Sequence, residues 1–118
     1  MLNDETHYRL LKLIETNPNM SQRELANAMG VSLGKINYCL RAVIETGLVK
    51  VKNFKANRNK RAYTYYLTPK GMEEKARVTI RFLKYKITEY EELKKDIEHL
   101  RREVACTEQF NTEAEEYS

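Results

Sequence analysis

The sequence predicts a mainly α-helical fold with one small β-hairpin and a long C-terminal helix. Two short helical patterns joined by a tight turn lie between Met20 and Gly47, and two strand-like segments over 48–54 and 62–67 follow them. A helical pattern then runs from Thr68 to about Ala105. We therefore expect a small domain over 1–68, a long helix over 69–106 and an acidic, flexible tail over 107–118.

The first expected helix lies at the N-terminus. Asn3 or Asp4 can cap it, and Asn17-Pro18 ends it. Four apolar residues share its inner face: Tyr8, Leu10, Leu11 and Ile14. This helix should complete a three-helix core. His7 on the same helix has no Cys or second His at metal-ligand spacing, so we expect it at the surface.

The second expected helix begins at Ser21, whose hydroxyl can accept from the backbone of Glu24 in a capping box. The helix ends at Gly30, where a left-handed residue suits a sharp turn. Ser32 can then cap the next helix at once. Small Ala26 and branched Ile36 fit a close crossing of the two helices.

The third expected helix separates an apolar stripe from a polar face. Ile36, Leu40 and Val43 form the stripe, with Cys39 beside it. Five residues suited to reading a DNA groove remain for the outer and leading faces: Ser32, Lys35, Asn37, Tyr38 and Arg41. This pattern is typical of a helix-turn-helix whose second helix enters the major groove. The alternative is a small helical hairpin of unrelated purpose.

A basic hairpin follows the two helices directly. It carries six positive residues: Lys50, Lys52, Lys55, Arg58, Lys60 and Arg61. No acidic residue occurs between Glu45 and Glu73, and such a one-signed field suits phosphates. Four of these cations lie in the expected loop and are candidates for contact with DNA: Lys55, Arg58, Lys60 and Arg61. The combination predicts a winged helix, although a solvated basic hairpin is the simpler alternative.

The long helix begins where Thr68 can cap and Pro69 takes the first helical position. Eight apolar residues follow one face as it drifts around the helix: Ile80, Leu83, Ile87, Tyr90, Leu93, Ile97, Leu100 and Val104. Their heptad spacing is broken once, near Lys94, by a three-residue stammer. We expect the stripe to form a homodimer, which favours a palindromic DNA site. The alternative is a helix that folds back on its own domain.

Composition limits which classes of protein the chain can belong to. The 118 residues are 42% hydrophobic and 32% charged, with a net charge of +4. Neither a membrane-spanning run of about 18 residues nor a signal-peptide layout is present, so we expect a cytoplasmic protein without membrane contact. The sequence has two His and lacks catalytic motifs and metal-spaced clusters, which predicts no enzyme activity, cofactor or metal. Cys39 is expected in the core and Cys106 as a free thiol.

Four segments carry a resemblance to a known family: SQRELA (21–26), VSLGKINYCLRA (31–42), GLVKVKNF (47–54) and LTPKGMEEKARVTIRFLKYK (67–86). Over about residues 5–105 the chain resembles winged-helix regulators of the MarR superfamily, specifically the short group associated with exopolysaccharide (EPS) production in bacteria. The resemblance implies a transcription factor for exopolysaccharide genes, with Ser32, Lys35, Asn37, Tyr38 and Arg41 facing double-stranded DNA. Because the chain is shorter than full-length MarR proteins, it implies no particular small-molecule effector.

Two other functions stay open at this point. A winged helix can serve as a protein–protein interaction module assembled through the long helix, but such a module needs no acid-free basic wing. Binding of RNA or single-stranded DNA would use Tyr63, Tyr65 and Tyr66 as a stacking platform. Strand alternation instead places Tyr63 and Tyr65 on one face with Leu67, which predicts that at least some of them belong to the core.

Overall fold

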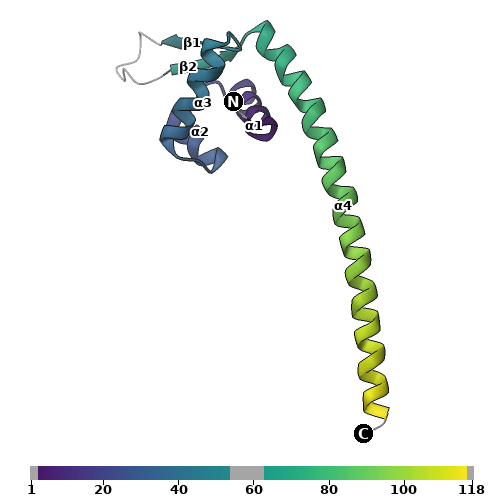
Figure 1. The fold of residues 1–118 in the computed structure, drawn as a ribbon. Helices are drawn as coiled ribbons and strands as arrows, with labels where there is room; N and C mark the ends of the chain where they lie inside the picture. The colour runs from purple at the N-terminus through teal and green to yellow at the C-terminus, as the bar shows by residue number, and fades with distance from the viewer. Residues whose placement is uncertain (1–2, 54–62, 117–118) are drawn as a thin grey trace. The chain divides into compact units, whose positions relative to one another are not determined.

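The computed structural model describes residues 3–53 and 63–116 (Figure 1). Within them the elements follow the order α1 (Asp4–Thr16), α2 (Gln22–Met29), α3 (Leu33–Glu45), β1 (Val49–Asn53), β2 (Tyr63–Leu67) and α4 (Pro69–Glu116). The chain divides into two compact units, Met1–Phe82 and Leu83–Ser118. The first unit contains three helices, the hairpin and the first turns of α4. The predicted fold class is confirmed: a winged helix-turn-helix followed by a long helix.

Each helix begins at a residue whose side-chain oxygen can accept a hydrogen bond from a backbone N–H of the first turn. In each case a side-chain oxygen accepts from the backbone N–H three residues later, at 2.7 to 3.1 Å; the acceptors are Asn3, Ser21, Ser32 and Thr68. The first N–H groups of a helix have no acceptor within the helix. Each cap therefore gives one of these groups a hydrogen-bond partner that it would otherwise lack. The predicted starts of all four helices are therefore confirmed.

The core of the first unit forms where α1, α2 and α3 meet the base of the hairpin. Its fully buried side chains include Leu10, Ile14, Leu25, Ile36 and Leu40. Ala26, 4% exposed, lies where α2 and α3 approach each other, as its small size predicts. Cys39 is also buried, and burial raises the pKa of its thiol, so it packs as a small apolar residue.

The hairpin is antiparallel, with Val49 opposite Leu67 and Val51 opposite Tyr65. Tyr65 is buried, and its backbone N–H donates to the carbonyl oxygen of Pro18 at 3.1 Å. Tyr63 and Tyr66 are exposed. The expectation that some of the three tyrosines belong to the core is thus confirmed for Tyr65 alone.

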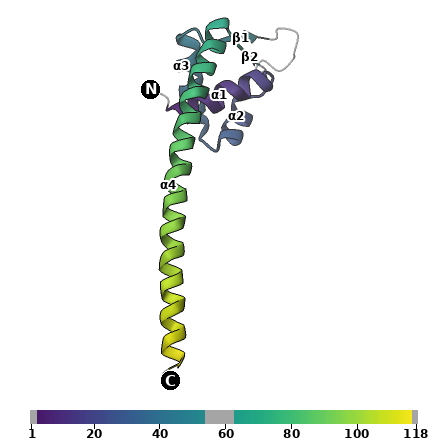
Figure 2. The ribbon, with the colours of Figure 1, turned by 90° about the vertical axis from the view of Figure 1, so that its right-hand side faces the viewer.

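The first turns of α4 pack against α1 (Figure 2). The Tyr8 and Phe82 rings stack with centroids 5.2 Å apart, and Lys75 Nζ lies 3.0 Å from Glu15 Oε2. Val78 between them is fully buried. Residues 69–82 therefore form part of the first unit, although the sequence alone predicts a single long helix over 69–106. This second packing face of α1 depends on residues 60 and 74 positions apart in the chain.

A close backbone approach joins the start of α4 to the end of α3. Thr68 Oγ1 donates to the carbonyl oxygen of Gly47 at 2.6 Å, and Thr68 N–H donates to that of Leu48 at 3.0 Å. Gly71 lies against the same Leu48 carbonyl, so closely that a Cβ atom there would collide with the oxygen. Only glycine fits this position without a shift of the backbone.

In the second unit, α4 continues to Glu116, eleven residues beyond the predicted end near Ala105. The acidic, flexible tail predicted over 107–118 is therefore wrong for 107–116, which are helical. This segment contains Glu, Gln and Ala and no Gly or Pro, so local helix preference continues through it. No helix within residues 3–53 and 63–116 has the length and apolar character needed to cross a membrane.

Candidate nucleic-acid interface

The turn between α2 and α3 sets the direction of the candidate recognition helix. Gly30 has φ +66°, and its N–H donates to the carbonyl oxygens of Ala26 and Asn27. Val31 N–H also donates to Ala26, at 3.0 Å. This left-handed C-cap ends α2, and Ser32 starts α3 two residues later. The short connection gives the two helices a defined crossing, as a helix-turn-helix requires.

The outer face of α3 presents two cations and a tyrosine to solvent. Lys35, Tyr38 and Arg41 are all exposed, Tyr38 by 61%. Among residues 3–53 and 63–116, no ion pair involves Lys35 or Arg41. Their charges are therefore not neutralised within the described chain. A flat, positive helix face of this kind suits the negative potential of a DNA groove.

The other two predicted contacts on this helix have structural roles in the free protein. Ser32 is exposed, but its hydroxyl accepts from the Lys35 N–H as the N-cap. Asn37 is half-buried, and its amide nitrogen donates to Gln22 Oε1 at 3.3 Å. Gln22 in turn donates to the Tyr65 hydroxyl at 3.3 Å. This chain of bonds links α3, α2 and β2, so Asn37 already uses part of the hydrogen-bonding capacity that reading adenine requires.

Gln22 belongs to the candidate interface, although no motif in the sequence indicates it. The oxygen of its side-chain amide accepts from Asn37 on the candidate recognition helix, and the nitrogen of the same amide donates to the Tyr65 hydroxyl in the hairpin. The partners are 15 and 43 positions away in sequence, and no local pattern identifies such a pair. Gln22 therefore links α3 to β2 of the hairpin and helps to fix their relative positions in the candidate interface.

The described part of the wing is also basic. Lys50 and Lys52 are exposed on β1, and Lys52 Nζ lies 5.2 Å from the centre of the Tyr66 ring. That contact is a cation–π interaction, which orders the ammonium group without neutralising its charge. The four predicted wing contacts Lys55, Arg58, Lys60 and Arg61 lie outside the described residues.

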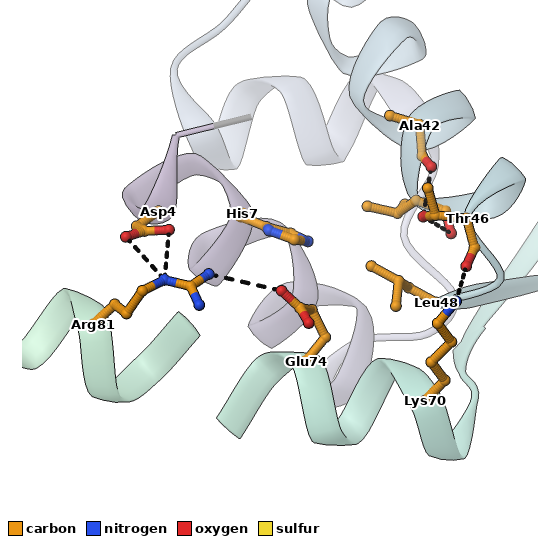
Figure 3. A pocket seen from close by; sticks show the side chains of 9 residues that line it. Asp4, His7, Ala42, Thr46, Leu48, Lys70, Glu74 and Arg81 are labelled. Carbon is orange, nitrogen blue, oxygen red and sulfur yellow. Dashed lines mark hydrogen bonds and ion pairs between the residues drawn. The ribbon is translucent and has the colours of Figure 1, made fainter. Parts of the chain in front are cut away.

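A surface pocket of about 410 Å³ lies elsewhere in the first unit, between α1, the end of α3 and α4 (Figure 3). One wall holds an ion-pair network in which Arg81 contacts Asp4 at 3.3 Å and Glu74 at 3.7 Å. Lys70 closes another side by donating to the Thr46 carbonyl oxygen at 3.0 Å. His7 projects from α1 into this pocket.

The predicted surface position of His7 is wrong, since the residue is half-buried and its Nε2 atom is fully covered. Within residues 3–53 and 63–116, Nε2 has no hydrogen-bond partner. The physical reason is the packing of α4 onto α1, which covers a face of α1 that looks polar in sequence. Burial lowers the pKa of His7, and so does Arg81, while Glu74 and Asp4 act in the opposite direction.

We expect this histidine to make stability depend on pH. Because its pKa is lower in the folded state, the unfolded chain binds the proton more readily, and stability falls as pH drops below about 6.5. Between pH 7.5 and 5.5, Tm should therefore decrease more in the wild type than in a His7→Gln variant, as measured by circular dichroism. Equal slopes in wild type and His7→Gln would contradict this expectation.

Comparisons with known proteins agree with the geometry. Residues 3–50 match the family model described as winged helix-turn-helix DNA-binding. A search of curated protein sequences gave no match. Among solved structures, the chain is similar to FabT of Streptococcus pneumoniae in complex with DNA, with 19% identity, a TM-score of 0.55, and coverage of 71% of this chain and 57% of FabT.

Two further structures extend this likeness. The transcriptional repressor CouR bound to a 23-mer DNA duplex has 26% identity and a TM-score of 0.53, and the match covers 61% of this chain and 49% of CouR. Wild-type MarR from E. coli has 20% identity and a TM-score of 0.54, with coverage of 62% and 53%. The chain thus spans about half the length of the regulators it matches. The match to the family model is over residues 3–50, and the fold is similar to that of MarR-family regulators.

Proposed function

We propose that the protein is a sequence-specific regulator of transcription that binds double-stranded DNA as a homodimer. The observation that carries the proposal is the exposed face of α3, where Lys35, Tyr38 and Arg41 stand on a helix-turn-helix without an ion-pairing partner in the described chain. In this arrangement α3 enters the major groove, and the wing contacts the backbone or the adjacent minor groove. The family resemblance further implies that the protein acts in the cytoplasm of a bacterium.

The side chains of α3 divide between reading bases and contacting phosphates. Arg41 and Lys35 can donate to guanine O6 and N7, and Tyr38 can donate to a phosphate oxygen. Ser32 can contact a phosphate while it caps the helix. Asn37 can bind an adenine edge in one of two ways. Either its hydrogen bond to Gln22 breaks, or only its carbonyl oxygen contacts the base. We therefore rank Arg41 first among the specificity residues.

Dimerisation would use the apolar stripe of α4, which the sequence analysis identifies from its spacing. The eight residues of this stripe are 41% to 61% exposed: Ile80, Leu83, Ile87, Tyr90, Leu93, Ile97, Leu100 and Val104. Exposed apolar side chains that follow one helix face favour association. A second copy of the same helix offers a matching stripe, and the resulting two-fold symmetry would present two recognition helices to one DNA site.

We expect Arg41→Ala and Lys60→Ala to have different effects. Loss of a bidentate guanine contact should cost about 1–3 kcal/mol on the preferred sequence and little on random DNA. Loss of a phosphate contact by Lys60 should weaken all sequences alike and flatten the dependence of affinity on salt. Titrations on preferred and random duplexes at several salt concentrations measure both. Equal losses on both duplexes for both variants would contradict the division.

DNA binding itself is tested by fluorescence anisotropy with an arbitrary labelled duplex at low and moderate salt. Binding at low salt that weakens as salt rises is the expected result, because phosphate contacts release counterions. Absence of binding even at low salt would favour the rival function, a winged-helix protein–protein interaction module assembled through α4.

The regulated genes are a finer part of the proposal. The resemblance to the exopolysaccharide-associated group makes genes of exopolysaccharide synthesis the first expected targets. Genome-wide mapping of bound sites would identify the targets and also give the spacing of half-sites. Enrichment of unrelated genes alone would remove this assignment and leave the DNA-binding proposal intact.

A further inference from the structure

We propose that Leu33 reads the methyl group of a thymine in the major groove, and that Gly34 beside it leaves the helix backbone bare so that Leu33 can reach the base. The inference rests on the proposed function, since it names a specificity contact within the same interface. Neither residue belongs to the predicted set of polar contacts on α3.

Leu33 is an exception among the leucines of the first unit. It is 48% exposed at the first residue of α3, between the N-cap Ser32 and Gly34. The other leucines described between residues 3 and 82 are buried or half-buried: Leu10, Leu11, Leu13, Leu25, Leu40, Leu48 and Leu67. The core therefore does not use Leu33. Its side chain is instead available at the end of the helix whose residues approach base edges in a helix-turn-helix complex.

Gly34 gives an independent observation at the next residue. Its backbone is helical rather than left-handed, so its φ angle does not require glycine. Apart from the two chain neighbours and the nearby backbone of α3 itself, no heavy atom of the described chain would lie within 4 Å of a Cβ atom added there. Glycine is less favourable than alanine in a helix, and the packing of the free protein offers no compensation for it. The fold does not require a glycine at position 34. Close approach of another molecule to the helix backbone does require one, because a side chain there would be in the way.

The chemistry of the major groove identifies that surface. Among the groups exposed there, the C5-methyl of thymine is the one that an aliphatic side chain can contact favourably, while the others are hydrogen-bond donors or acceptors. The exposed cations Lys35 and Arg41 of the same helix attract the phosphates on either side of the groove. Leu33 therefore lies at the start of a helix whose charged side chains bring DNA to it.

The test removes one methyl group at a time. The wild-type protein first selects its preferred duplex from a random library, and each thymine of that duplex is then replaced by deoxyuridine. Wild-type affinity should fall about two- to fourfold at one thymine in each half-site. Leu33→Ala should bind the thymine duplex about three- to tenfold more weakly and should show no further loss with deoxyuridine. Leu33→Met, which keeps an apolar side chain, should restore the response to the methyl group.

Two more variants separate this contact from general effects. Met72→Ala removes a similarly exposed apolar side chain from α4 and should keep the wild-type response to deoxyuridine. Gly34→Ala should raise Tm by about 2–4 °C and still weaken binding to the selected duplex, because the added methyl group blocks the approach. A gain in stability with unchanged affinity would overturn the role of Gly34.

The outcomes distinguish the inference from the proposed function. If the wild type selects no preferred duplex, sequence-specific binding fails and the thymine contact fails with it. If a preferred duplex emerges but deoxyuridine has no effect on the wild type, or affects Leu33→Ala equally, the thymine contact alone is overturned.

Discussion

Gly71→Ala should lower the free energy of unfolding by about 2–3 kcal/mol, because the new methyl group would collide with the carbonyl oxygen of Leu48. The obstacle is backbone, which cannot rotate away as a flexible side chain can. The first turn of α4 must therefore move from the end of α3, and the bonds that Thr68 makes to Gly47 and Leu48 must lengthen. Chemical denaturation followed by circular dichroism measures the loss.

The matched control for this substitution is Gly34→Ala, the same chemical change at a helical glycine with open space around its α-carbon. Its stability should equal or exceed that of the wild type, because alanine favours helix and meets no obstacle. If the two substitutions changed stability by the same amount, the close approach between Gly71 and Leu48 could not be the cause.

Placing glutamates at Ile87 and Ile97 should convert the proposed dimer to a monomer and lower affinity for the preferred duplex about a hundredfold or more. Both side chains lie on the exposed apolar stripe of α4, and charges there would be buried in the interface. A monomer holds one recognition helix and loses the gain in effective concentration that links the second half-site to the first. Light scattering coupled to size-exclusion chromatography, with anisotropy titrations, measures both effects.

The control variant carries glutamates at Thr88 and Cys106, which helical spacing places on the opposite face of α4. It changes the net charge to the same extent, so general electrostatic repulsion of DNA is equal in the two proteins. The control should keep twice the mass of one chain and bind as the wild type does. A wild-type protein that is monomeric at micromolar concentration would contradict dimerisation through this stripe.

The parts of the fold that sequence predicted correctly depend on local chemistry. Ser21 and Ser32 cap helices and Gly30 ends α2 because each acts on backbone within four residues of itself. The strands of the hairpin were predicted within one residue of β1 and β2 for similar reasons. The acidic composition beyond Ala105 is typical of disorder, but the same residues favour helix, so α4 extends farther than composition predicts.

The features that sequence did not predict depend on contacts between distant segments. His7 is covered because α4 packs against α1, and Gln22 joins Asn37 to Tyr65 only in the folded domain. The close contact at Gly71 likewise needs Leu48, 23 positions earlier. Helical periodicity assigns a residue to a face of its own helix, but it does not say which other element covers that face.

The hydrogen bonds between Leu48 and Thr68 also bear on which residues of the hairpin can be substituted. These bonds bring the two ends of the hairpin together at its base, and Gly71 packs against the same Leu48 carbonyl from the first turn of α4. The strands beyond this closure contain both buried residues, such as Val49 and Tyr65, and exposed ones, such as Lys50 and Lys52. The exposed positions can therefore change in charge during evolution, whereas the buried ones are held by the packing of the domain.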